Sequence, residues 1–153
     1  MVWLRRNAGG LLGLVLALAG LQRLGREAEA TGTLTGFVPC SGQGALAITT
    51  RGGDAAALTA LRDLDDDVTH RCLLAERAVV HALDADCHSA MGAHATITGE
   101  TMTLQAFAGR VDGSAWLSDE LTGPAAQPQR LGAQVAERLR SAGADAILER
   151  APR

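Results

Sequence analysis

One cysteine lies where covalent chemistry is easiest to support. Cys87 follows an Ala- and Leu-rich stretch, residues 76–83, that predicts a helix, and it precedes a strand-forming stretch. A short loop between them would present a single thiol. A thiolate is a strong nucleophile and a thioether is a stable product, so this position suits permanent attachment of a group. The alternative is a small buried hydrophobic residue, which the neighbours Asp86 and His88 disfavour.

The other two cysteines are predicted to be packing residues. Cys72 lies on the apolar face of a helix predicted over residues 68–83, and Cys40 precedes a glycine-containing turn at 41–44. Three cysteines are an odd number and show no paired spacing. A disulfide framework is therefore not expected, and a reducing cytoplasm is favoured.

Composition excludes several classes of site. All fourteen basic residues are arginine, so these residues offer neither a Schiff-base lysine nor a P-loop lysine. The net charge of −3 gives no electrostatic support for nucleic-acid binding. No Gly-x-Ser-x-Gly hydrolase motif occurs in the sequence. No two histidines show the short spacing of a structural zinc site, so no metal is predicted; the three near the reactive cysteine are His81, His88 and His94.

The pattern of elements predicts an α+β fold. Helices are expected over 55–63 and 68–83 and from Pro128 to Gly143, and a short terminal element, helix or strand, is expected at 144–149. Apolar and polar residues alternate within 96–109, turn signals occur at 98–100 and 111–113, and a further strand is expected at 115–122. We expect a three-stranded antiparallel sheet with helices on one face, preceded by an incomplete α/β remnant.

The sequence divides into three segments. Residues 1–10 are an unassigned N-terminal extension, residues 11–53 the remnant of α/β domains, and residues 54–153 the C-terminal α+β domain. Within the remnant, a buried strand is expected at 45–48, after the glycine turn.

The first thirty residues allow two interpretations. Arg5 and Arg6 precede an apolar run at 11–21, and Ala28-Glu29-Ala30 could be a cleavage site, which together resemble a secretory signal peptide. Charged residues at 23–27 interrupt that pattern, and the run is shorter than the roughly 20 residues that span a bilayer. A buried strand at 14–18 leading into a helix that ends near Gly25 is favoured.

Several motifs in order resemble one enzyme family, porphobilinogen deaminase (hydroxymethylbilane synthase), in its C-terminal part. They are Gly42-Gln43-Gly44-Ala45-Leu46-Ala47-Ile48, Ala75-Glu76-Arg77-Ala78, residues 83–87 and Gly92-Ala93, with similarity also at 15–25, 112–114 and 122–124. The resemblance covers about residues 11–150. It implies a transferase of tetrapyrrole biosynthesis that polymerises four porphobilinogen units with loss of ammonia.

The resemblance also implies a covalent cofactor site. Cys87 would hold a dipyrromethane cofactor by a thioether, and the growing oligopyrrole would extend from it. Gly42, Gln43 and Gly44 would lie near the cofactor cleft, although a mere turn before a strand is as good an interpretation. Ala85-Asp86 replace the Gly-Gly that usually precedes this cysteine, and because Ala and Asp resist angles open to glycine, we expect less efficient loading.

The family's catalytic aspartate and its arginine cluster fall in segments without a counterpart in this sequence. We therefore expect the chain to be inactive alone, unless a separate chain supplies the missing domains. Strands at 14–18 and 45–48 would then be exposed edges. Two alternatives remain: a non-catalytic interaction or regulatory domain that keeps the fold, and a small exported protein with residues 1–30 as signal peptide.

Overall fold

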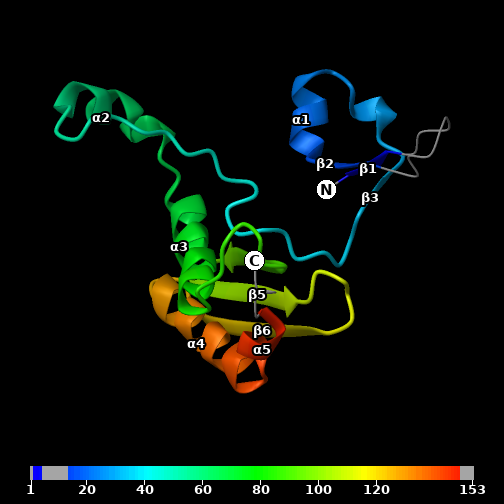
Figure 1. Ribbon diagram of the computed structural model, residues 1–153. Coiled ribbons are helices and arrows are strands. Elements are labelled where there is room, and N and C mark those ends of the chain that lie inside the picture. Colours follow the sequence, from blue (N-terminus) through cyan, green and yellow to red (C-terminus); the bar gives the residue numbers. More distant parts are fainter. Residues whose placement is uncertain (1, 5–13, 149–153) are drawn as a thin grey trace. The chain divides into compact units, whose positions relative to one another are not determined.

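The computed structural model describes residues 2–4 and 14–148, and the chain forms two compact units, residues 1–37 and 38–153 (Figure 1). The second unit contains the predicted C-terminal domain and also residues 38–53. Residues 38–53 have their contacts within this second unit.

The N-terminal unit contains a small antiparallel sheet and a helix. β1 (Val2–Leu4) pairs with both β2 (Leu14–Leu16) and β3 (Gly32–Thr33), and α1 (Leu18–Arg23) follows β2, with a 3₁₀ turn at Glu27–Glu29. The predicted order of strand and helix is confirmed. The prediction that the strand is buried is wrong, since Leu14 and Val15 are nearly half exposed. The buried residue here is Leu21 of α1.

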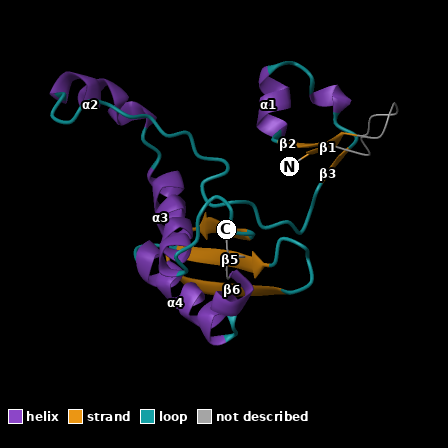
Figure 2. Ribbon diagram, viewed as in Figure 1, coloured by secondary structure: helices purple, strands orange, loops and turns teal. Residues whose placement is uncertain are grey.

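The C-terminal unit is an antiparallel meander covered by helices (Figure 2). β4 (Met91–Thr98), β5 (Thr101–Gly109) and β6 (Trp116–Pro124) pair in chain order. The helices α3 (Asp67–Ala82) and α4 (Pro128–Ser141) pack against one face, with α5 (Ala144–Leu148) after them. The predicted α+β class is confirmed.

Capping residues set where the helices begin. The Asp54 carboxylate accepts from the Ala57 N–H at 3.0 Å and starts α2 (Ala55–Leu61), which continues as a 3₁₀ turn at Arg62–Leu64. Asp66 accepts from the Thr69 N–H at 2.7 Å and starts α3. Pro128 occupies the first turn of α4, where its missing N–H costs nothing.

Strand alternation places the core between sheet and helices. Met102, Leu104, Ala106 and Ala108 of β5 are fully buried on the helix-covered face. The intervening residues of β5, such as Gln105, lie on the other face. α3 and α4 contribute further apolar side chains to this core, which are Ala75, Val79, Leu131, Val135, Ala136 and Leu139. The sheet is thus apolar on one face, as expected for a helix-covered antiparallel sheet.

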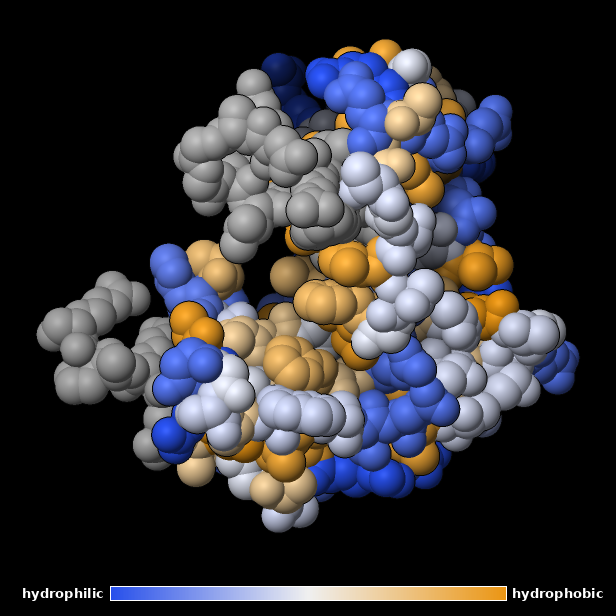
Figure 3. All heavy atoms as spheres, turned by 90° about the vertical axis from the view of Figure 1, so that its right-hand side faces the viewer, coloured by the Kyte–Doolittle hydropathy of each residue, from blue (hydrophilic) through white to orange (hydrophobic). Residues whose placement is uncertain are grey.

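Residues 45–48 are not a strand, so that prediction is wrong. Leu46 is 76% exposed and Ile48 57% exposed, because no neighbouring strand pairs with this segment in the structure described. The expectation of an exposed segment is confirmed here. β2 pairs with β1 but is an edge strand of its sheet, and its Leu14 and Val15 side chains are exposed. Exposed apolar side chains occur in both units, and Figure 3 shows hydrophobic residues, coloured orange, at the surface.

The helices α3 and α4 pack closely at Gly132. A Cβ built there would meet the Ala75 carbonyl oxygen and would lie 2.6 Å from the Ala78 Cβ. Glycine at this position therefore sets how closely the two helices approach, and through them how α3 lies on the sheet.

We predict that Gly132→Ala destabilises the C-terminal unit by about 1–3 kcal/mol, the usual cost of overpacking. Chemical denaturation would measure it. Gly20→Ala in α1 is the control, because a Cβ at that position would meet no atom within 4 Å and alanine favours helix. Equal stability of Gly132→Ala and the original chain would contradict the packing argument.

Candidate functional site

The loop that carries Cys87 begins with a defined helix end. After α3, the Ala85 N–H donates to the Val80 carbonyl at 3.0 Å and the Asp84 N–H donates to the His81 carbonyl at 3.2 Å. This pair of bonds is the Schellman motif, which requires one left-handed residue. Asp84 takes that position with a φ of 48°. The end of α3 therefore fixes the direction in which the chain enters the loop.

The next four residues form a turn closed by its own side chains. The Asp86 N–H donates to the Ser89 Oγ at 3.0 Å, and the Ser89 N–H donates to the Asp86 carbonyl at 3.1 Å. The Asp86 carboxylate accepts from the His88 N–H at 2.9 Å and from the Ser89 hydroxyl at 3.2 Å. Cys87 is the second residue of this turn, and it is exposed with a free thiol.

The backbone of this loop accommodates Ala85 and Asp86 in place of the two glycines that usually precede the cysteine. Among the described non-glycine residues, Asp84 is the only one with a positive φ. Ala85 and Asp86 both have ordinary φ values, so neither position needs a glycine. Moreover, Asp86 supplies turn bonds that glycine could not. The efficiency of loading itself stays a prediction.

The predicted glycine turn packs on the same unit. Gly42 has a φ of +72°, and a Cβ there would lie 3.0 Å from the Leu73 Cδ1 atom, so both conformation and space favour glycine. The Gln43 N–H donates to the Cys40 carbonyl at 3.1 Å, and Gln43 itself is exposed. A Cβ on Gly44 would meet no atom within 4 Å, so space does not require glycine there.

A buried glutamate joins this turn to the C-terminal domain. Glu76 of α3 is only 7% exposed. Its Oε2 accepts from the Gly42 N–H at 2.7 Å, and its Oε1 accepts from the Ala95 N–H of β4 at 2.9 Å. The His94 Nδ1 lies 3.7 Å from the same Oε1. In the sequence Glu76 is visible only as part of the Ala75-Glu76-Arg77-Ala78 motif, and the helical pattern of residues 68–83 does not indicate its burial.

A second junction lies two residues earlier in β4. The Ala93 N–H donates to the Pro39 carbonyl at 3.0 Å. A Cβ on Gly92 would lie 2.5 Å from the Val38 carbonyl oxygen, so only glycine lets this segment cross β4. The Gly92-Ala93 motif is thereby explained as a crossing point of two backbones.

The other cysteines differ in their surroundings. Cys72 is half-buried against the core, near its predicted place. Burial raises the pKa of the Cys72 thiol, and the negative charge of Glu76 raises it further. Cys40 is exposed, so its prediction as a packing residue is wrong.

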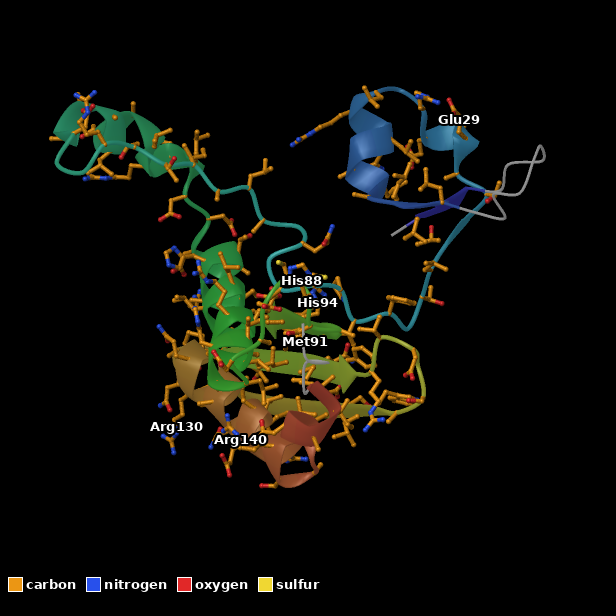
Figure 4. All side chains as sticks on the ribbon, in the orientation of Figure 1. Glu29, His88, Met91, His94, Arg130 and Arg140 are labelled. Carbon is orange, nitrogen blue, oxygen red and sulfur yellow. The ribbon has the colours of Figure 1, made fainter. Side chains whose placement is uncertain are left out.

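Histidines and a methionine also lie along this part of the chain. Figure 4 labels His88 in the turn and Met91 and His94 in the strand that follows. Among the residues that the structure describes, no three His, Cys, Asp or Glu side chains are grouped so that they could hold a metal ion. Across the same residues, no helix has the length and apolar character needed to cross a membrane.

Two family models match the chain. The model described as porphobilinogen deaminase, C-terminal domain, matches residues 70–141, which include the Cys87 turn and Glu76. The model described as porphobilinogen deaminase, dipyromethane cofactor binding domain, matches residues 4–59, which include the glycine turn. The chain belongs to the porphobilinogen deaminase family. The recognition made from motif order is confirmed.

Curated relatives agree with this assignment. A porphobilinogen deaminase of Thiobacillus denitrificans is 38% identical over 141 residues, which are 91% of this chain and 46% of that protein. The porphobilinogen deaminase of Trichlorobacter lovleyi is 40% identical over 138 residues, which are 89% of this chain and 44% of that protein. That of Corynebacterium diphtheriae is 38% identical over 144 residues, which are 93% of this chain and 49% of that protein. The chain spans about half the length of the curated relatives it matches.

We predict that iodoacetamide alkylates Cys87 faster than Cys72 at pH 8. Cys72 is half-buried and has a raised pKa, so less of it is thiolate at that pH and its reaction rate should rise only at higher pH. Peptide mass spectrometry over a pH series measures both rates. Exposed Cys40 serves as the accessibility control, and equal rates at Cys72 and Cys87 would contradict the assigned environments.

Proposed function

We propose that this chain is the C-terminal portion of a hydroxymethylbilane synthase and that Cys87 holds a dipyrromethane group by a thioether. The supporting observation is an exposed, free thiol on a turn that is closed by its own hydrogen bonds and set by the end of α3. Such a turn holds a covalently attached group at a defined origin while leaving the sulfur accessible.

The attachment chemistry suits this thiol. The Cys87 Sγ forms a bond to the methylene carbon of an aminomethylpyrrole such as porphobilinogen, the carbon–nitrogen bond breaks, and the thiol proton leaves with the ammonia. When bound, the dipyrromethane supplies a pyrrole end to which further rings are joined. The residues of this chain provide the sulfur, the rigid turn and an adjacent surface.

We infer that the glycine turn forms part of that surface. Gln43 is exposed, and its segment is tied to the Cys87-bearing domain through Gly42 and Pro39. Gly42 keeps side-chain bulk away at this point. In this proposal, Gln43 offers an amide that hydrogen-bonds the attached oligopyrrole.

The acidic residue and the arginine cluster needed for polymerisation come from outside these 153 residues. In support, a groove of about 430 Å³ opens on the C-terminal unit and is lined mostly by aliphatic side chains, its lining residues being Leu46, Ile48, Thr50, Leu58, Leu61, Arg62, Leu64 and Asp65. We propose that polypeptide from the missing family domains covers it, whether in the same or a separate chain. The three free cysteines fit a cytoplasmic location.

The test is the intact mass of the full chain, purified from a host that makes porphobilinogen and then incubated with porphobilinogen. We predict an added dipyrromethane mass that is lost in Cys87→Ser and kept in the matched control Cys40→Ser. No hydroxymethylbilane should be released by the chain alone.

Three results would contradict parts of the proposal. An unmodified thiol in a full-length chain would favour the non-catalytic interaction domain instead. An adduct that survives Cys87→Ser would place the attachment elsewhere. Loss of the first thirty residues on isolation would favour the exported protein.

A further inference from the structure

We propose that Glu76 is a positioning residue that locks the glycine turn, residues 40–45, onto the domain that carries Cys87. The inference deepens the proposed function and rests on it for its biological meaning. Its physical basis is separate: one carboxylate bridges two backbone segments that are 34 and 19 residues away in the sequence.

The two contacts need a carboxylate in particular. Each oxygen accepts one backbone N–H, from Gly42 at 2.7 Å and from Ala95 at 2.9 Å. An ionised carboxylate is an acceptor at both oxygens, whereas a glutamine amide has one acceptor and would direct its NH₂ group at the second N–H. An apolar side chain of the same size would leave the buried Ala95 donor and the partly buried Gly42 donor without this acceptor.

The Ala95 contact also closes the free edge of β4. β4 pairs with β5 on one side only. On the other side the Ala93 N–H is taken by the Pro39 carbonyl and the Ala95 N–H by Glu76. The segment 38–42 and the glutamate together therefore occupy an edge that would otherwise be open to strand pairing.

Position along the chain gives these contacts their consequence. The Pro39 contact fixes the beginning of the segment, but Gln43 lies beyond it. Glu76 holds the turn at Gly42, directly before Gln43. Glu76 lies within α3, and the C-terminal end of the same helix forms the Schellman motif that leads into the Cys87 turn. Through one helix, Glu76 fixes where Gln43 lies relative to the sulfur.

The shortest contacts given for the Glu76 carboxylate are to backbone N–H groups. The His94 imidazole on β4 lies 3.7 Å away, and the half-buried Cys72 lies one helical turn earlier on α3. The backbone N–H groups are therefore the closest partners of the carboxylate, which is the pattern of a structural clamp that joins segments.

The experiment is amide hydrogen exchange by NMR on the full chain with Glu76→Ala and Glu76→Gln. We expect Glu76→Ala to accelerate the exchange of the Gly42 and Ala95 amides. The factor should be at least about tenfold larger than for the core amides of Leu104 and Val135. In Glu76→Gln one of the two should accelerate. Glu137→Gln, the same change at an exposed position of α4, should leave all four unchanged.

A second measurement separates positioning from stability. A nitroxide is attached to Cys87 after the other two cysteines are replaced by serine. We expect its broadening of the Gln43 amide signal to weaken in both Glu76 variants, while the broadening of Met91, at the start of β4, stays the same.

Uniform acceleration of all amides, with unchanged broadening at Gln43, would show that Glu76 only supports stability and would overturn the proposal. Unchanged exchange at both Gly42 and Ala95 would overturn it as well. Both measurements are made without any pyrrole. Failure of Cys87 to accept a dipyrromethane would therefore contradict the proposed function and leave the role of Glu76 decided by these two results.

Discussion

A buried carboxylate that must satisfy two backbone donors is the constraint on which this domain depends. Leaving a buried N–H without an acceptor costs about 1–3 kcal/mol, and Glu76 satisfies one on the glycine turn and one on β4. The helix, the strand edge and the crossing segment are thereby tied at one point. The tie is polar, so it specifies one geometry where apolar contact alone would allow several.

The same helix then sets the proposed anchor. α3 carries Glu76 in its middle and ends in a Schellman motif at Asp84, and the turn that follows is closed by Asp86 and Ser89. A nucleophile on a loop is useful only if its surroundings hold it in place. Here local hydrogen bonds hold the backbone of Cys87 while the sulfur remains exposed.

Local patterns were enough to predict most of the C-terminal unit. Asp54 and Asp66 cap helices because their carboxylates reach N–H groups three residues on, and alternation along β5 follows from strand geometry. The motif order then indicated the family. These features need no knowledge of distant segments.

Features set by distant segments could not be predicted in this way. Burial of Glu76 depends on where Gly42 comes to lie, which no helical period encodes. Cys40 was expected in the core and is exposed, and residues 45–48 have strand-forming composition but no neighbouring strand in the structure described. The role of Gly92 appears only when the crossing carbonyl of Val38 is in place.

The carbon–sulfur bond proposed at Cys87 can itself be detected by NMR. The chain is loaded with porphobilinogen enriched in ¹³C at the aminomethyl carbon and studied by multiple-bond NMR correlation. We predict a correlation between the labelled methylene carbon and the Cys87 β-protons. A label that correlates with Cys40, or with no cysteine, would contradict it.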